Sequence, residues 1–444
     1  MLPSSAGVVV AGGGAAGFMA AIAAAEAGAR DVHVLEATPE PLHKVLISGG
    51  GRCNVTHACW DPKALVGHYP RGGSALRGPF SRFATGDAVA WFADHGLELV
   101  EEADGRMFPR SNRSESVAAT LRRAAQAAGV TLHTGVLVQG VSGCSSGGFA
   151  LEVRCAGGGS PAGAGASAQR TWLRARQLVL ATGGHPSGRR LAAALGHGVV
   201  PPVPSLFTLA LGADPLLQLA GVVMDPVELE LVLPADGASR APQRWRQRGP
   251  VLITHWGLSG PATLRLSAFA ALALHQVGYR ASLRVDWTGG RSEQELEQWF
   301  AQARRDQAKR QLANGRPWPE LSRRLWLHLL EQVGVDPERR WADLAKAHQQ
   351  GLIQALRASS YSISGRGPFG EEFVTAGGIP LGEVHLARME SRLHRGLYLA
   401  GELLDVDGIT GGFNFQHCWS SGWLAGQAIA EAQEQGGPSQ QREG

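Results

Sequence analysis

A run of small and apolar residues near the start of the chain, VVVAGGGAAGFMAAIAAAEAG at positions 8–28, most constrains what this protein can fold into. Such a run could be the apolar core of a secretion signal, which also needs a positively charged start. The residues before it, MLPSSAG, contain no Lys or Arg, and Gly12, Gly13 and Gly14 interrupt the apolar run. We therefore interpret the stretch as a strand, a turn and a helix.

The glycines of this stretch have the spacing of a dinucleotide-binding turn. Gly12, Gly14 and Gly17 form the pattern G-x-G-x-x-G, which allows a tight turn, close approach to a pyrophosphate and close packing of helix on strand. The helix expected over 15–27 points its free N–H groups at the phosphates. A second strand over 32–35 ends in Glu36, whose carboxylate can accept hydrogen bonds from ribose hydroxyls.

The same spacing recurs in SISGRGPFGEEF at Gly365, Gly367 and Gly370, where it predicts no nucleotide site. Pro368 lies inside this pattern, no apolar helix follows, and no acidic strand end comes about 20 residues later. We interpret this segment as a loop.

Composition and charge narrow the class of protein. With 444 residues, of which 44% are hydrophobic and 18% charged, the chain is expected to form two or three globular domains. The net charge of +4 is small for this length. We interpret the basic clusters RWRQR (244–248) and ARRDQAKRQ (303–311) as solvated helix faces or loops, and expect no stable complex with nucleic acid.

The cysteines and histidines show no metal or disulfide pattern. None of the five cysteines forms C-x-x-C, so a reducing cytoplasm is the expected compartment. His33, His43 and His57 lack ligand spacing, and no metal is expected. No apolar run of 18 residues free of glycine breaks and charges occurs, so no membrane-spanning helix is expected.

The order of the patterns predicts a nucleotide fold interrupted by an insertion. Residues 1–196 combine a loop-rich stretch after Glu36, helices over 87–95 and 114–128, and a meander of short strands leading into QLVLATGG; the Gly/Ser/Ala-rich residues 157–168 are expected to be a flexible hairpin tip. Residues 197–290 are expected to form an inserted β-rich domain, and 291–370 a helical subdomain with a return segment. Residues 371–444 then complete the nucleotide fold.

Three further glycine-rich stretches could contact a flavin nucleotide. In LHKVLISGGGRCNVTH (42–57), Arg52, Asn54 and Thr56 offer donors, although an ordinary turn explains the stretch equally well. In LAGELLDVDGITGGFNFQ (399–416), Glu402 is placed to accept from ribityl hydroxyls, and Gly411–Gly412 open a helix whose dipole would stabilise an anionic reduced ring. The third stretch is ATGGH (181–185). The aromatic residues of the last helix, Phe415, Trp419 and Trp423, are expected to belong to the core.

Together these stretches resemble the BaiN/YhiN-type NAD(P)/FAD-dependent oxidoreductases, which share a glutathione-reductase-type fold. The resemblance covers most of the chain and rests on GGGAAG with Glu36, KVLISGGGRCNVTH, GRMFPRSNRS, LVLATGG, LITHWGLSGP, VTAGGI and LYLAGELLDVDGITGGFNFQ. It implies an α/β fold with a discontinuous Rossmann-like FAD-binding domain of the GR2 type, a β-meander, and an inserted β-rich domain carrying a helical subdomain. It also implies bound FAD and reductase-like activity; one family member is a bile-acid enone reductase. The family's GGYN reads Gly411-Gly412-Phe413-Asn414 here, which removes a hydroxyl at residue 413.

The turns and the resemblance together predict the cofactor-binding residues. They are Gly12, Gly13, Gly14, Ala15, Ala16, Gly17, Glu36, Ala37, Lys44, Ser48, Gly49, Gly51, Arg52, Cys53, Asn54, Val138, Ala181, Thr182, Gly183, Gly401, Glu402, Gly411, Gly412, Phe413 and Asn414.

The leading functional hypothesis is an FAD enzyme that takes electrons from NAD(P)H and reduces a small organic acceptor, such as an enone. No second complete fingerprint for NAD(P)H is found, so this donor is expected to bind transiently, in the inserted domain or at the flavin face. Two alternatives are an FAD oxidase of a small amine or other metabolite, and a flavoprotein in RNA modification or acting as a binding module. His255, Arg52 and Asn54 could face a substrate, but no catalytic residue is assigned; Cys53 lacks a partner cysteine and is expected to pack. The oligomeric state stays open.

Overall fold

The structure is a computed structural model that describes residues 2–155, 169–234, 242–368 and 374–435. The chain forms two compact units, one of residues Met1–Pro202 with Thr375–Gly444 and the other of Val203–Val374. The chain passes between them within β10 (Val200–Ser205) and β17 (Val374–Gly378), which pair with each other. The sequence predicts boundaries at 196/197 and 370/371, a few residues earlier than the structure has them in both cases. The predicted hairpin tip at 157–168 lies outside the described residues.

The first unit is built on a twisted sheet with strand order β18-β19-β20-β9-β1-β2-β6, joined by β7 and β8. Its strands are β1 (Ser5–Ala11), β2 (Val32–Glu36), β6 (Thr131–Thr134), β7 (Val136–Gly143), β8 (Phe149–Cys155), β9 (Gln169–Leu180), β18 (Val384–His385), β19 (Glu390–Ser391) and β20 (Leu397–Leu399); a small separate sheet contains β3 (Thr56–His57), β4 (Leu99–Glu101) and β5 (Arg106–Pro109). The helices are α1 (Ala15–Glu26), α2 (His43–Gly51), α3 (Pro62–Leu65), α4 (Arg77–Phe80), α5 (Thr85–Asp94), α6 (Ser114–Ala127), α7 (Pro186–Ala194) and α12 (Phe413–Gln435).

Strands β20, β9, β1, β2 and β6 run parallel, so their carboxyl ends meet at one edge. The central strand β1 lies between β9 and β2, where the chain order reverses, and ligands of open α/β sheets bind at such a point. The meander is present as β7, β8 and the first half of β9. The predicted strands TWLRA and QLVL are one continuous strand, β9, because its second half joins the parallel sheet without a turn.

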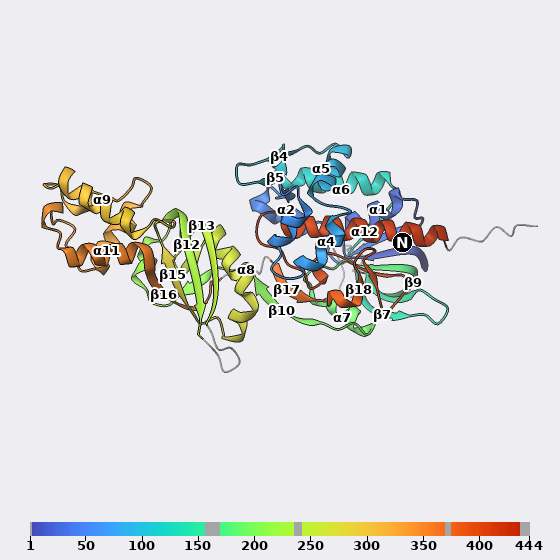
Figure 1. Ribbon diagram of the computed structural model, residues 1–444. Coiled ribbons are helices and arrows are strands. Elements are labelled where there is room, and N and C mark those ends of the chain that lie inside the picture. Colours follow the sequence, from blue (N-terminus) through green and yellow to red (C-terminus); the bar gives the residue numbers. More distant parts are fainter. Residues whose placement is uncertain (1, 156–168, 235–241, 369–373, 436–444) are drawn as a thin grey trace, which may run out of the picture. The chain divides into compact units, whose positions relative to one another are not determined.

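Helices α1 and α12 pack unusually closely. A Cβ atom built on Gly422 would lie 2.6 Å from the carbonyl oxygen of Ala16, and one on Gly426 would lie 2.7 Å from that of Ala20. The predicted aromatic face of α12 belongs to this core, because Trp419 is fully buried and Phe415 stacks on it. Figure 1 shows α12, coloured red, beside the blue α1.

The second unit is a closed barrel of order β11-β14-β13-β12-β15-β16. It contains β11 (Leu209–Leu211), β12 (Val223–Leu233), β13 (Gln243–Ile253), β14 (Gly257–Ser259), β15 (Ala281–Asp286), β16 (Ser359–Arg366), α8 (Pro261–Gln276), α9 (Glu293–Asp306), α10 (Arg323–Gln332) and α11 (Lys346–Ala358). Helices α9 to α11 lie between β15 and β16 in the sequence. Barrel residues such as Val251 and helical residues such as Trp326 belong to one hydrophobic core, so the segments 197–290 and 291–370 are not separate bodies.

Three segments differ from the sequence interpretation. Residues 362–366 of the SISGRGPFGEEF segment are not a loop but belong to strand β16, which pairs with β15 and β11; residues 369–373 of that segment lie outside the described residues. The RWRQR segment is neither a helix face nor a loop, because it lies within β13 and pairs along β12. The loop-rich stretch after Glu36 contains a helix, α2, which Ser48, Gly49 and Gly50 interrupt with non-helical backbone angles.

Candidate nucleotide-binding site

The glycine turn after β1 separates into positions that face protein and one that faces open space. Gly12 has φ +115°, and a Cβ there would lie 2.4 Å from the carbonyl oxygen of Ala181. A Cβ on Gly17 would lie 1.9 Å from the carbonyl oxygen of Gly12, so α1 packs against its own turn. A Cβ on Gly14, in contrast, would meet no atom within 4 Å. The turn therefore brings backbone, without side chains, to a free volume at the start of α1.

Helix α1 presents its positive end to this volume without a capping side chain. Gly14 is its N-cap and has no capping side chain, and no acidic residue lies in the first turn. The first N–H groups of a helix have no partner within it, and the helix dipole adds about half a positive charge there. Ala15 and Ala16, both buried, supply two of these N–H groups without side chains that reach across them. The arrangement suits a pyrophosphate.

Glu36 closes the turn from β2. Its Oε2 accepts from the N–H of Gly13 at 2.8 Å, and its Oε1 accepts from the N–H and the hydroxyl of Thr38 at 2.8 and 2.7 Å. An ionised carboxylate has about four acceptor positions, so acceptor capacity is left for ribose hydroxyls. Ala37, the next residue, is exposed beside it.

A second carboxylate lies at the same edge of the sheet. Glu402 Oε2 pairs with Lys44 Nζ at 2.6 Å, and its Oε1 accepts from the N–H of Thr375 at 3.2 Å. Cβ positions on Gly183 and Gly184 would lie 3.6 and 3.0 Å from these oxygens. The ATGG turn, Lys44 and Glu402 are thus neighbours, although they come from three distant parts of the chain.

The residue before Glu402 joins this turn to the phosphate turn. A Cβ on Gly401, which has φ +70°, would lie 2.7 Å from the Cβ of Ala16. The N–H of Gly401 donates to the hydroxyl of Ser421 on α12 at 2.9 Å. Ala181 bonds to Ala11 through its N–H and is buried. The hydroxyl of Thr182, buried and without a hydrogen-bond partner, would lie 1.7 Å from a Cβ on Gly188 and so faces α7.

The SGGG turn forms a glycine-lined surface, and Asn54 connects it to the residues just before α12. Gly49, Gly50 and Gly51 all have positive φ, and Cβ atoms on Gly50 and Gly51 would meet nothing within 4 Å. In the amide orientation that satisfies both its atoms, Asn54 donates to the carbonyl of Thr56 at 2.8 Å and accepts from the N–H of Gly412 at 3.1 Å. Asn54 therefore ties this turn to the glycines before α12.

Several predicted cofactor contacts have structural partners. Arg52 lies over the ring of Phe108 at 3.9 Å and pairs with Glu102. Cys53 is fully buried with φ +58°, and burial raises the pKa of its thiol to about 12. The hydroxyl of Ser48 donates to the carbonyl of Val45 at 3.0 Å.

Three more predicted residues lie as follows. Asn414 exchanges two hydrogen bonds with the backbone of Gly408, at 2.8 and 2.9 Å. Val138 is buried in β7 opposite Val153. His255 is exposed in the turn between β13 and β14 of the other unit.

Phe413 is the centre of an aromatic cluster that the sequence analysis missed. The ring of His68 stacks on it with centroids 4.3 Å apart, that of His57 lies at 4.6 Å, and the hydroxyl of Tyr69 donates to its carbonyl at 2.6 Å. Burial lowers the pKa of His57, whose Nδ1 lies 3.2 Å from the carbonyl oxygen of Gly411. Phe413 lacks the hydroxyl of the tyrosine in the family motif, and no described side chain supplies one at that position. The hydroxyl of Tyr69 bonds instead to the backbone carbonyl of Phe413.

A buried ion pair fixes the LDVDG segment and was also missed. Arg71 donates to both carboxylate oxygens of Asp407, and that side chain is completely inaccessible. The neighbouring Asp405 has a pKa raised by burial and by the charge of Asp407. The sequence near Arg71 gives little indication of this ion pair beyond the glycines that follow, because Asp407 lies 336 residues away.

Two features are absent from the described part of the chain. Over 2–155, 169–234, 242–368 and 374–435, no group of three or more His, Cys, Asp or Glu side chains could hold a metal ion. Within the same residues, no helix combines the length and apolar character needed to cross a bilayer.

The strand order, the glycine turn and Glu36 define a Rossmann-type FAD-binding fold, and with it the class of FAD-dependent oxidoreductases. The chain belongs to the family described as HI0933-like protein Rossmann domain, whose model matches residues 6–428. This match confirms the family resemblance and the expected fold class.

Named relatives extend along almost the whole chain. It is 31% identical over 433 residues to the 3-dehydro-bile acid delta(4,6)-reductase of Clostridium scindens, covering 95% of this chain and 98% of that protein. It is 28% identical over 439 residues to the ribosomal RNA dihydrouridine synthase of Escherichia coli, covering 96% and 98%. Among solved structures, a 3-ketosteroid-delta4-(5alpha)-dehydrogenase from Rhodococcus jostii has a TM-score of 0.50 at 18% identity, covering 97% of this chain and 98% of that one, which shows similarity of fold.

Proposed function

We propose that this protein takes electrons from NAD(P)H through bound FAD and reduces a carbon–carbon double bond conjugated to a carbonyl in a small organic acceptor. The observation that carries the reaction is the full-length similarity to the bile-acid reductase, whose name describes double bonds reduced beside an oxidised 3-position. The observation that supports the cofactor is the free volume at Gly14, bordered by the positive end of α1.

The chain's own residues would divide the work of holding FAD. The N–H groups of α1 and the glycine turn would bind the pyrophosphate, and Glu36 would accept from ribose hydroxyls. Glu402, already oriented by Lys44 and the N–H of Thr375, would accept from the ribityl chain. The glycine surface at Gly49–Gly51 would allow the ring to approach the backbone. Bound FAD supplies the two-electron carrier that accepts hydride from a nicotinamide and delivers it to carbon.

Helix α12 would contribute electrostatically. It begins at Phe413, directly after Gly411 and Gly412, and no acidic residue lies in its first turn. A helix N-terminus next to a ring that gains negative charge on reduction stabilises it by about 0.3–2 kcal/mol. Asn54 would keep these glycines in place through the N–H of Gly412.

A second candidate acceptor is a uridine in RNA. The observation that favours it is the relative named as a ribosomal RNA dihydrouridine synthase in Escherichia coli, with a further one in Haemophilus influenzae at 26% identity over 437 residues. The two named reactions share one chemistry, because the double bond lost when uridine becomes dihydrouridine is also conjugated to a carbonyl. The same flavin site could therefore serve either acceptor.

The test is anaerobic reduction and reoxidation of the purified holoprotein. NADH and NADPH are added separately, and the expected result is rapid bleaching of the flavin bands with at least one of them. A bile acid with a 3-oxo-4,6-diene is then added and should restore the bands without oxygen, whereas its saturated counterpart should not. Bands that return with oxygen, but with neither the dienone nor RNA, would indicate an oxidase. Bands that return with uridine-containing RNA, but not with the dienone, would select the second acceptor. A protein that neither contains nor takes up FAD would refute the proposal.

A further inference from the structure

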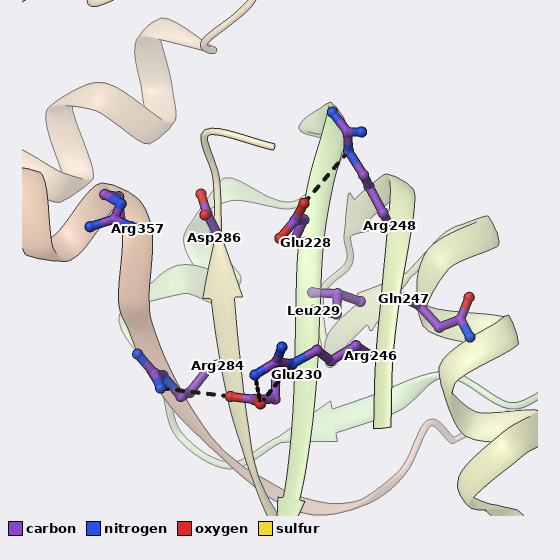
Figure 2. Close-up of a pocket in the computed structure, with 9 residues that line it drawn as sticks. All are labelled: Glu228, Leu229, Glu230, Arg246, Gln247, Arg248, Arg284, Asp286 and Arg357. Carbon is purple, nitrogen blue, oxygen red and sulfur yellow. Dashed lines mark hydrogen bonds and ion pairs between the residues drawn. The ribbon is translucent and has the colours of Figure 1, made fainter. Parts of the chain in front are cut away.

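The RWRQR segment forms a row of arginines on the outer face of the barrel. Arg244, Arg246 and Arg248 occupy every second position of β13, so they lie on one face of the strand and about 7 Å apart. Their side chains are 49%, 77% and 61% exposed. Figure 2 shows Arg246 and Arg248 on this face, with Gln247 turned away toward the neighbouring helix.

Glu230 on β12 organises one end of this row. Its Oε1 accepts from Arg246 Nε and Nη2 at 2.9 and 2.7 Å and lies 3.3 Å from Arg244 Nη1, while its Oε2 lies 3.6 Å from Arg284 Nη1. Arg246 and Arg284 reach it from the strands on either side (Figure 2). Burial acts to raise the pKa of Glu230, but the hydrogen bonds and charges of the arginines outweigh it and lower the pKa. One ionised carboxylate therefore holds three guanidinium groups, with two positive charges in excess.

The row borders a surface hollow of about 470 Å³. Four arginines and three carboxylates line it: Arg246, Arg248, Arg284, Arg357, Glu228, Glu230 and Asp286. Oδ1 of Asp286 accepts from the N–H and hydroxyl of Thr288, and Glu228 lies 3.8 Å from Arg248, so these two carboxylates share one arginine contact at the other end of the hollow. The end near Glu230 is thus the positive end of the hollow.

We propose that this arginine face binds the sugar–phosphate backbone of RNA. A guanidinium carries five N–H donors in a planar fork that matches phosphate oxygens, and each of Arg244 and Arg284 uses one terminal nitrogen on Glu230. The side chains of Arg244 and Arg284 are 49% and 52% exposed, so their remaining N–H donors can reach a phosphate while each keeps its contact with Glu230. A row repeating along a strand suits a polymer of evenly spaced charges better than a single small anion. The proposal rests on the second candidate acceptor, since a uridine in RNA reaches the enzyme as part of such a polymer.

The test measures RNA binding by the holoprotein, separately from flavin chemistry. Fluorescence anisotropy of a short labelled single-stranded RNA is recorded against salt for the native protein and for the triple variant R244Q/R246Q/R284Q. Each phosphate contact adds about 0.7 to the slope of log K against log salt, so losing three should lower the slope by about 2 and weaken binding roughly 100-fold at about 0.1 M salt. The single variant R284Q, which leaves Glu230 bonded to Arg246, should lower the slope by about 0.7 and covers the case in which the triple variant does not fold.

The matched control is R305Q/K309Q/R310Q, which removes three exposed positive charges from the same unit. Its slope and affinity should stay within about twofold of the native values. Equal losses in both triple variants, or no RNA binding by the native protein, would overturn the proposal. So would a polyglutamate peptide that binds as tightly and with the same dependence on these arginines, because the face would then serve an acidic protein. The dienone assay does not involve this surface. Failure of the RNA-binding test therefore leaves the proposed dienone reduction standing, and failure of dienone reduction leaves the proposed RNA binding standing.

Discussion

One methyl group, placed at either of two glycines three residues apart, should separate cofactor binding from folding. At Gly14 the backbone angles, φ −91° and ψ −170°, suit any residue, and a Cβ meets nothing within 4 Å. At Gly17 the same atom would lie 1.9 Å from the carbonyl oxygen of Gly12. The sequence motif treats both glycines alike, whereas in the structure Gly14 faces open space and Gly17 faces the protein backbone.

The two substitutions differ in expected magnitude. Gly14→Ala weakens the helix N-cap by about 0.5–1 kcal/mol, which the reduced freedom of the unfolded chain largely offsets. Gly17→Ala overlaps a backbone atom by more than 1 Å and should cost about 3 kcal/mol, or a fall in Tm of about 5 °C for a unit of this size. The methyl of Ala at position 14 would occupy space beside the first N–H groups of α1, and we expect FAD to bind at least about tenfold more weakly, equivalent to about 1.4 kcal/mol.

The assay compares both variants with the native protein after FAD has been removed, because bound ligand itself raises Tm. Thermal melts of the apoproteins give the stability, and titration with FAD gives the affinity. Gly14→Ala should melt within about 1 °C of the native apoprotein and bind FAD poorly. Native FAD affinity in Gly14→Ala, or an unchanged melt in Gly17→Ala, would refute the assignment of these two positions.

Three further outcomes are expected. Arg71→Met should destabilise the protein by about 3–5 kcal/mol in urea unfolding, because it leaves the buried carboxylate of Asp407 without its bidentate partner, and Asp407→Asn should not add to that loss in the double variant. Burial lowers the pKa of His417 from 6.5 to about 4, so below pH 6.5 the unfolded chain binds a proton there that the folded protein does not. The free energy of unfolding should therefore be unaffected by this group above pH 6.5 and fall by about 3 kcal/mol as the pH decreases toward 4. His417→Asn should flatten this dependence in unfolding experiments at several pH values. Cys53, buried with a pKa of about 12, should remain unlabelled by iodoacetamide at pH 8 in the native protein and become labelled in urea, as peptide mass spectrometry would report.

The phosphate turn was predictable because its determinants are contiguous. Strand, glycines, helix and Glu36 fall within residues 8–36, so their spacing alone indicates the turn. The SGGG turn and the glycines before α12 were also recognised, but their connection through Asn54 was not, since nothing local links that amide to Gly412.

The barrel and the buried ion pair lay beyond the reach of sequence patterns for a physical reason. Strand β13 alternates charged and partly buried residues, but its high density of charge is also typical of a solvated helix. The carboxylate that pairs with its arginines, Glu230, lies on another strand and cannot be recognised from the local sequence. Helix α8 is apolar on most sides because it packs against the barrel, so it shows no clear helical period. The pairing of Arg71 with Asp407 depends on the completed fold alone.

The close contact between α1 and α12 determines when the first unit can be completed during synthesis. Gln427 on α12 bonds to the carbonyl of Ala23 on α1 across 404 residues of sequence. At about 5–20 residues per second, a ribosome needs about 20–80 s to make the intervening chain. The barrel, whose residues 203–374 form a continuous segment, can fold during that interval. Throughout that interval the apolar surface of α1 lacks its partner helix, and exposed apolar surface of this kind favours aggregation of incomplete chains.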